Sequence, residues 1–71
     1  MKKLLAYAVV MMLGIVDQVH DDYALIEYKA PTGELRYLNY RVDMIPCEVS
    51  EGLKVQVEQL SPRRNKVFCS I

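Results

Sequence analysis

Apolar and polar residues alternate along much of this chain, in short runs separated by turn-forming residues. Residues 53–58 alternate most cleanly, which predicts a strand with one face toward a core and the other toward water. The inward set there is Leu53, Val55 and Val57. Residues 23–29 alternate in the same way, and the residues sharing their apolar face are Ala24, Ile26 and Tyr28. The pattern is typical of half-buried strands.

Turn chemistry divides the rest of the chain into further short runs. Strands are predicted over residues 14–19, 23–29, 34–41, 53–58 and 66–71. Turns are predicted at 20–22, 30–33, 50–52 and 61–65, where Asp, Pro, Gly, Ser and Asn gather. Residues 42–46 read as a connector, because Pro46 cannot donate to a central ladder. The run 34–41 carries bulky side chains on both faces. It is therefore predicted to be a central strand of the sheet, or a strand that curls as barrel strands do.

Five short strands with frequent turns indicate an all-β protein. We expect a small five-stranded barrel of SH3-like or OB-like type over residues 14–71. Closure is favoured over an open meander, because an open sheet leaves two unprotected edges.

The first thirteen residues form a separate hydrophobic segment. Lys2 and Lys3 precede thirteen uncharged and mostly apolar residues, 4–16, which resembles the start of a secretory signal. The run is too short to span a bilayer, which takes about 20 apolar residues. It is either an export signal or uncleaved anchor, with membrane contact through this segment, or a buried helix or strand. Localisation stays open between exported or membrane-associated and cytoplasmic or virion-associated.

Length and charge limit the functional classes. The chain has 71 residues with nine basic and nine acidic side chains, so it forms one small domain with zero net charge. That leaves no room for separate cofactor and substrate domains. A zero net charge also disfavours nucleic acid as a partner, because such domains are usually clearly basic.

Four short motifs are spaced along residues 14–57. They read G-I-V-D at 14–17, D-Y-A-L-I-E at 22–27, I-P at 45–46 and E-G-L-K-V at 51–55. This spacing resembles a family of very short bacterial and phage β-barrel proteins of unknown function. The resemblance implies a small barrel and brings no catalytic residues with it. The chain departs from the family pattern at Leu53, where Asp is common, and in its longer N-terminal run and C-terminal strand.

The two cysteines leave two alternatives. Cys47 and Cys69 lie 22 residues apart and would close a loop contributing about 3 kcal/mol in an oxidising compartment. Counting from a turn centred near Arg63 places Cys69 opposite about Val57, so simple hairpin pairing does not join the cysteines. A bridge requires the connector after Cys47 to fold back across the barrel. Otherwise Cys69 is expected to be a buried core residue.

The tyrosines and arginines of the third run form the candidate partner-binding surface. The residues are Tyr37, Tyr40, Arg36 and Arg41. Tyr and Arg are enriched in protein interfaces, and on a barrel face the same residues would suit stacking of single-stranded nucleic acid. The plainer alternative is that the tyrosines complete a small core with their hydroxyls in water.

The remaining polar clusters indicate no chemistry. Arg63, Arg64 and Lys66 form a basic turn that would contact two or three phosphates at most. The cluster at 20–22, even with Asp17 and Glu27 added, is expected to be a solvated turn. Catalytic signatures are missing from the sequence, and two cysteines with one histidine lack zinc-site spacing. We therefore expect no catalytic residues, no metal site and no cofactor.

These observations predict a non-enzymatic small β-barrel that acts as an accessory or interaction protein. It is expected to be phage-encoded, and either exported or part of a larger assembly. Its expected partner is another protein or a second copy of itself. The alternative is an OB-type module that binds single-stranded nucleic acid.

Overall fold

A computed structural model describes residues 10–61 and 63–70. Its elements are β1 (Val10–His20), β2 (Tyr23–Lys29), β3 (Leu35–Arg41), the 3-10 turn η1 (Val42–Met44), β4 (Lys54–Ser61) and β5 (Arg64–Cys69). The strands form one antiparallel sheet in the order β3-β2-β1-β4-β5. The predicted all-β fold with five strands is confirmed.

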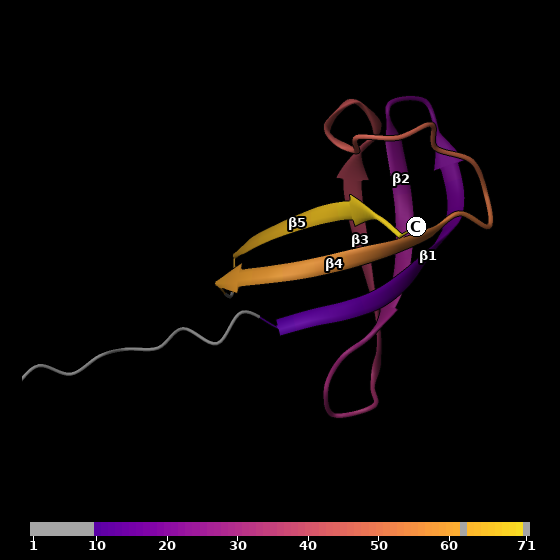
Figure 1. The fold of residues 1–71 in the computed structure, drawn as a ribbon. Helices are drawn as coiled ribbons and strands as arrows, with labels where there is room; N and C mark the ends of the chain where they lie inside the picture. Colours follow the sequence, from indigo (N-terminus) through magenta and orange to yellow (C-terminus); the bar gives the residue numbers. More distant parts are fainter. Residues whose placement is uncertain (1–9, 62, 71) are drawn as a thin grey trace, which may run out of the picture.

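Strand β1 belongs to both halves of this sheet. Its first half pairs with β4, from Val10 opposite Gln59 to Ile15 opposite Lys54. Its second half pairs with β2, from Gly14 to His20, with an irregularity in register between Val16 and Gln18. Figure 1 shows β1 as a long curved strand, with the β4–β5 hairpin running across the direction of β2 and β3. The sheet is therefore curled into a half-barrel.

The predicted start of the sheet at Gly14 is wrong by four residues. Strand β1 begins at Val10, so the boundary drawn after residue 13 falls inside a strand. A cleavage after Gly14 would remove most of the pairing between β1 and β4. The pair Lys2 and Lys3 and the apolar residues 4–9 lie outside the described residues. Within the described part of the chain, no helix is long and apolar enough to cross a membrane.

Strand β3 is a terminal strand of the sheet, and the alternative of a central position is wrong. It pairs with β2 alone, just as β5 pairs with β4 alone, and no ladder joins β3 to β5 within residues 10–61 and 63–70. Side chains fill the seam between them. Tyr40, Met44 and Pro46 face residues 66–68 of β5 around a small cavity of about 210 Å³. Within the described residues, backbone hydrogen bonds between β3 and β5 therefore do not close the curled sheet into a complete barrel.

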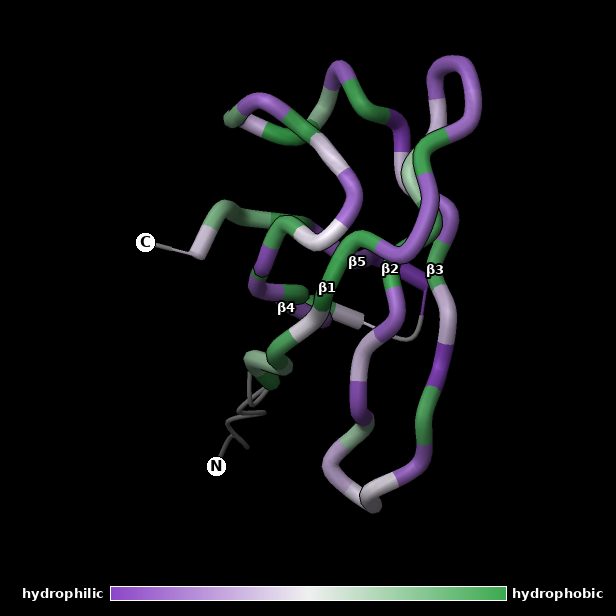
Figure 2. Tube along the Cα trace, turned by 90° about the vertical axis from the view of Figure 1, so that its right-hand side faces the viewer, coloured by the Kyte–Doolittle hydropathy of each residue, from purple (hydrophilic) through white to green (hydrophobic). Residues whose placement is uncertain are grey.

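The core is a compact set of aliphatic side chains on the inner face of the curled sheet. Its most buried large members are Ile26, Val16, Val55 and Val57. The inward sets predicted for residues 23–29 and 53–58 are confirmed where they are most buried, because Ala24, Ile26, Val55 and Val57 have no exposed surface. Figure 2 shows β1 as a largely hydrophobic stretch between β4 and β2.

The turns predicted at 20–22 and 30–33 lie where the sequence places them, whereas the turn predicted over 61–65 is shorter, because β4 extends to Ser61 and β5 begins at Arg64. His20 pairs with Tyr23 across a two-residue turn in which Asp21 adopts a positive φ of 51°. Asp tolerates this left-handed backbone better than most residues do. In the next turn the Gly33 amide donates to the Ala30 carbonyl at 2.8 Å, as expected for the A-P-T-G sequence.

The connector between β3 and β4 folds back over the sheet. Ile45 is buried, and Cys47 and Val49 also pack against the core, while the residues between them are exposed. Cys47 and Cys69 form a disulfide with their Cα atoms 6.2 Å apart. Of the two alternatives for the cysteines, the structure shows the one in which the connector folds back.

The pairing predicted for Cys69 is wrong by two residues. Cys69 lies opposite Val55, and Val57 lies opposite Val67. The hairpin centre is nearer residue 62 than Arg63, because the register shifts between Gln59 and Ser61. Moving the centre of a hairpin by one residue moves each cross-strand partner by two.

Reduction of the disulfide is expected to destabilise the fold strongly. The bridge spans 22 residues, and opening it should lower the free energy of unfolding by about 2–4 kcal/mol. Urea unfolding with and without dithiothreitol measures this loss. The Cys47→Ala/Cys69→Ala variant is the control, since its unfolding should not respond to the reductant. Equal midpoints for the oxidised and reduced wild type would contradict the prediction.

Substitution of Gly14 is expected to destabilise the sheet in proportion to side-chain size. A Cβ at this position would lie 3.1 Å from Ile26 Cγ2 and 3.2 Å from the Glu27 carbonyl oxygen. We expect Gly14→Ala to lower the free energy of unfolding by about 1–3 kcal/mol, and Gly14→Val to lower it further. At an ordinary strand position both changes would raise stability, because glycine is a poor strand former. Urea unfolding measures the change in the free energy of unfolding for each variant. A decrease agrees with the steric conflict at Gly14, and an increase contradicts it.

Candidate functional site

The two tyrosines predicted to share a partner-binding surface lie on opposite faces of β3. Tyr37 is on the outer face of the sheet and is 58% exposed. Tyr40 is on the inner face, half-buried, and packs against the core. Positions three apart in a strand always point to opposite sides. The predicted surface of Tyr37, Tyr40, Arg36 and Arg41 is therefore not a single surface.

The arginines of that set are paired with neighbouring carboxylates. Arg36 donates to Glu34 at 3.2 Å. Arg41 donates to both carboxylate oxygens of Asp43, at 3.1 and 2.9 Å. This hydrogen bonding raises the pKa of Arg41 and lowers the pKa of Asp43. The ion pair is therefore present at neutral pH and is lost as pH falls through the lowered pKa of Asp43. Both cations are neutralised locally and offer little to a phosphate.

The basic turn contacts these residues only through Lys66, which lines the same small cavity as Tyr40. Arg63, Arg64 and Lys66 are all exposed near the turn between β4 and β5. Lys66 lies directly opposite Glu58 in the ladder. The turn thus presents two arginines without bringing either Tyr37 or Tyr40 beside them in the sheet.

The acidic cluster at 20–22 forms a solvated turn. The His20 ring bonds to Gln18 at 2.8 Å, and Asp21 and Asp22 are exposed. Among the described residues, no three His, Cys, Asp or Glu side chains converge in a way that could hold a metal ion.

The most distinctive surface is one that sequence patterning did not identify. Of the eight exposed large hydrophobic residues in the described chain, seven point outward from the same side of the sheet. We call this side the outer face, and its seven exposed apolar members are Met11, Leu13, Ile15, Tyr23, Leu35, Tyr37 and Phe68. Leu13 is the most exposed of them at 73%. Exposed apolar residues that gather on one face mark interaction surfaces.

The outer face was missed because its exposed apolar residues come from four strands. Met11, Leu13 and Ile15 alternate with the core residues Met12 and Val16. In the sequence both sets merge into one apolar run, which hides the period of two. Only the alternation of burial along β1 separates the inward set from the outward set. That alternation becomes visible only when the strand pairing is known.

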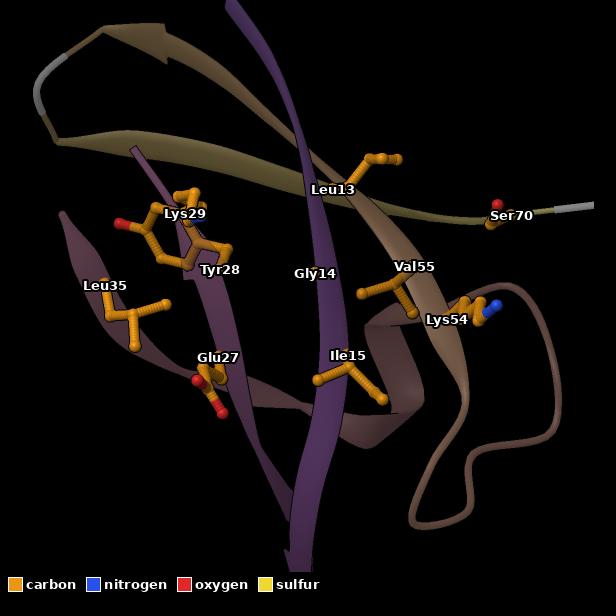
Figure 3. A pocket seen from close by; sticks show the side chains of 10 residues that line it. All are labelled: Leu13, Gly14, Ile15, Glu27, Tyr28, Lys29, Leu35, Lys54, Val55 and Ser70. Carbon is orange, nitrogen blue, oxygen red and sulfur yellow. The ribbon is translucent and has the colours of Figure 1, made fainter. Parts of the chain in front are cut away.

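A shallow groove crosses the outer face at the middle of β1. It has a volume of about 440 Å³ and is lined on both sides of Gly14 by apolar side chains, with Leu13, Ile15 and Leu35 among them. Figure 3 shows Leu13 and Ile15 projecting from β1 on either side of Gly14. Lys29 and Lys54 line the groove from the strands on opposite sides of β1, and Glu27 lies beside Ile15 in the ladder. The groove is thus apolar with charged residues at its margins.

Comparison of the chain with protein-family models, curated proteins and solved structures gives no match. The resemblance of residues 14–57 to short bacterial and phage barrels stays a prediction.

We expect no oligonucleotide binding at micromolar concentration in about 150 mM salt, because the cations near Tyr37 are paired with acids. Fluorescence anisotropy with a labelled single strand measures this. If a stacking platform existed, Tyr37→Ala would weaken binding by about 1–3 kcal/mol. Micromolar binding that Tyr37→Ala abolishes would contradict the prediction, and Thr32→Ala, in the exposed turn after β2, serves as the control.

Proposed function

We propose that this protein is a non-enzymatic interaction module that binds a protein partner through the outer face. The observation that carries the proposal is the gathering of seven exposed apolar side chains on that face. Folding gains nothing from side chains such as Leu13, because they stay largely in water. A partner that covers them would remove this apolar surface from water, which favours binding.

The composition of the outer face supports a protein partner. Its exposed residues include the aromatic rings of Tyr37 and Phe68 on the outermost strands β3 and β5, with charged residues of β2 and β4 between them. Aromatic residues are enriched in protein interfaces, where charged residues surround and orient the contact.

We propose an OB-like topology for the half-barrel in preference to an SH3-like one. Strand β1 lies between β2 and β4, the outermost strands are β3 and β5, and a long connector separates β3 from β4. A partly open five-stranded barrel of this kind supports the OB assignment. OB barrels bind nucleic acid with the loops after the first and fourth strands. Here the first of these loops carries Asp21 and Asp22, which repel phosphate, whereas the second carries Arg63 and Arg64, which attract it. The two loops therefore do not form one basic surface, which supports the protein partner over the alternative of a single-stranded nucleic-acid module.

We also propose that the protein works in an oxidising compartment, which includes the surface of a virion. The support is the disulfide between Cys47 and Cys69, because such bridges persist outside the reducing cytosol.

Site-specific photocrosslinking tests the proposed function. A photoreactive amino acid replaces Leu13, and the matched control places it at the exposed Thr32 in the turn after β2. In cells that produce the protein naturally, we expect a discrete adduct from position 13 and none from position 32. Mass spectrometry of the adduct identifies the partner. Absence of any adduct at position 13, or equal adducts at both positions, would rule out the outer face as the binding surface.

A further inference from the structure

Three strands of the outer face arrange their side chains in three rows. The pairing of β1 with β4 and of β4 with β5 fixes which residues share a row. The central row is Leu13, Gln56 and Phe68. The row toward the start of β4 is Ile15 and Lys54, with Ser70 following β5, and the row toward the end of β4 is Met11, Glu58 and Lys66.

The two outer rows are complementary to one another. Each holds an apolar residue of β1 at the same place, Ile15 in one and Met11 in the other. On β4 the corresponding places hold opposite charges, Lys54 and Glu58, one on each side of the uncharged Gln56. A face with this order of charges is complementary to itself when a second copy is turned end over end.

A two-fold rotation about an axis along the central row places each outer row of one copy over the other outer row of the second copy. Two copies stacked face to face about that axis would have their β4 strands antiparallel. Lys54 of each copy would then lie over Glu58 of the other, and Ile15 over Met11. Leu13 and Phe68 would each lie over their own counterparts, as an isologous interface requires. Lys66 would lie over the neutral Ser70, so no two like charges would be directly opposed.

We infer that the partner covering this part of the outer face is a second copy of the same chain, held in a symmetric dimer. The inference rests on the proposed function, since it names the partner of the same surface. The apolar central row supplies the contact, and the two symmetry-related pairs of Lys54 with Glu58 fix its orientation.

Association through the strand edges is less favourable. The free edge of β5 carries Arg64 and Lys66, and the free edge of β3 carries Arg36 and Arg41. Charged side chains on edge strands, Lys above all, are a common device against edge-to-edge pairing. The outer face has no such protection at its centre.

The size of the face sets the expected affinity. Standard interfaces use about 20–30 residues on each side, whereas the three rows contain about a third as many. We therefore expect a dimer that dissociates in the micromolar range rather than an obligate one.

Charge reversal tests the inference. Sedimentation of the full oxidised chain from about 10 to about 500 µM should show a concentration-dependent dimer. Lys54→Glu and Glu58→Lys should each weaken it at least tenfold, because each places two pairs of like charges face to face. Glu51→Lys, in the exposed turn before β4, is the control and should leave the dimer unchanged. Circular dichroism and thiol counting check that every variant is folded and oxidised.

Two further measurements identify the two-fold arrangement. An equimolar mixture of the Lys54→Glu and Glu58→Lys variants should dimerise as the wild type does, because their reversed charges complement each other. The Lys54→Glu/Glu58→Lys double variant should recover the dimer on its own. A dimer that ignores the single reversals, or one that neither mixing nor the double variant restores, would overturn the inference.

The outcome separates this inference from the proposed function. A chain that stays monomeric throughout the concentration range overturns the second-copy partner. The proposed function then still stands if position 13 crosslinks to a different protein. If position 13 crosslinks to nothing while the chain is monomeric, both fail.

Discussion

The continuity of strand β1 across two halves of the sheet is the constraint on which the rest of the structure depends. Its first half pairs with β4 and its second with β2, and the two ladders overlap only at Gly14 and Ile15. At that overlap the space for a side chain at Gly14 is already taken by Ile26 and the backbone of β2. The absence of a Cβ lets β1 and β2 approach each other, and Ile26 of β2 then lies in the same core as Val16 of β1 and Val55 of β4.

A core of this size needs support from outside the sheet. A domain of about 70 residues buries only about 60% of the surface that its unfolded chain exposes. The largest fully buried side chains here are one isoleucine and three valines, with no aromatic among them. The connector after β3 adds Ile45 to this core, and the disulfide fixes the connector to the end of β5. The bridge thus contributes a large part of a net stability that in small domains is only a few kcal/mol.

Local features of the fold were predictable from the sequence, and features that depend on several strands were not. The turn at 30–33 and the inward faces of β2 and β4 follow from residue type and alternation alone. The terminal position of β3 does not follow from the sequence. Bulky side chains on both faces are compatible with a central strand, and equally with a terminal strand that packs its inner side and exposes Tyr37. The disulfide depended on the connector folding back over the sheet, and the cross-strand partner of Cys69 depended on a register shift between Gln59 and Ser61, and no local pattern reveals either.

The fold explains the second part of the apolar run that resembles an export signal, namely residues 10–16. Residues 10–16 are apolar throughout because β1 carries core residues on its inner side and Met11, Leu13 and Ile15 on its outer side. A strand in which both faces are apolar is characteristic of sheets covered on both sides. In this chain the connector and the curl of the sheet cover the inner side, whereas within the described residues the outer side stays open to solvent. Under the proposed function, this open side of β1 is the side that the partner covers.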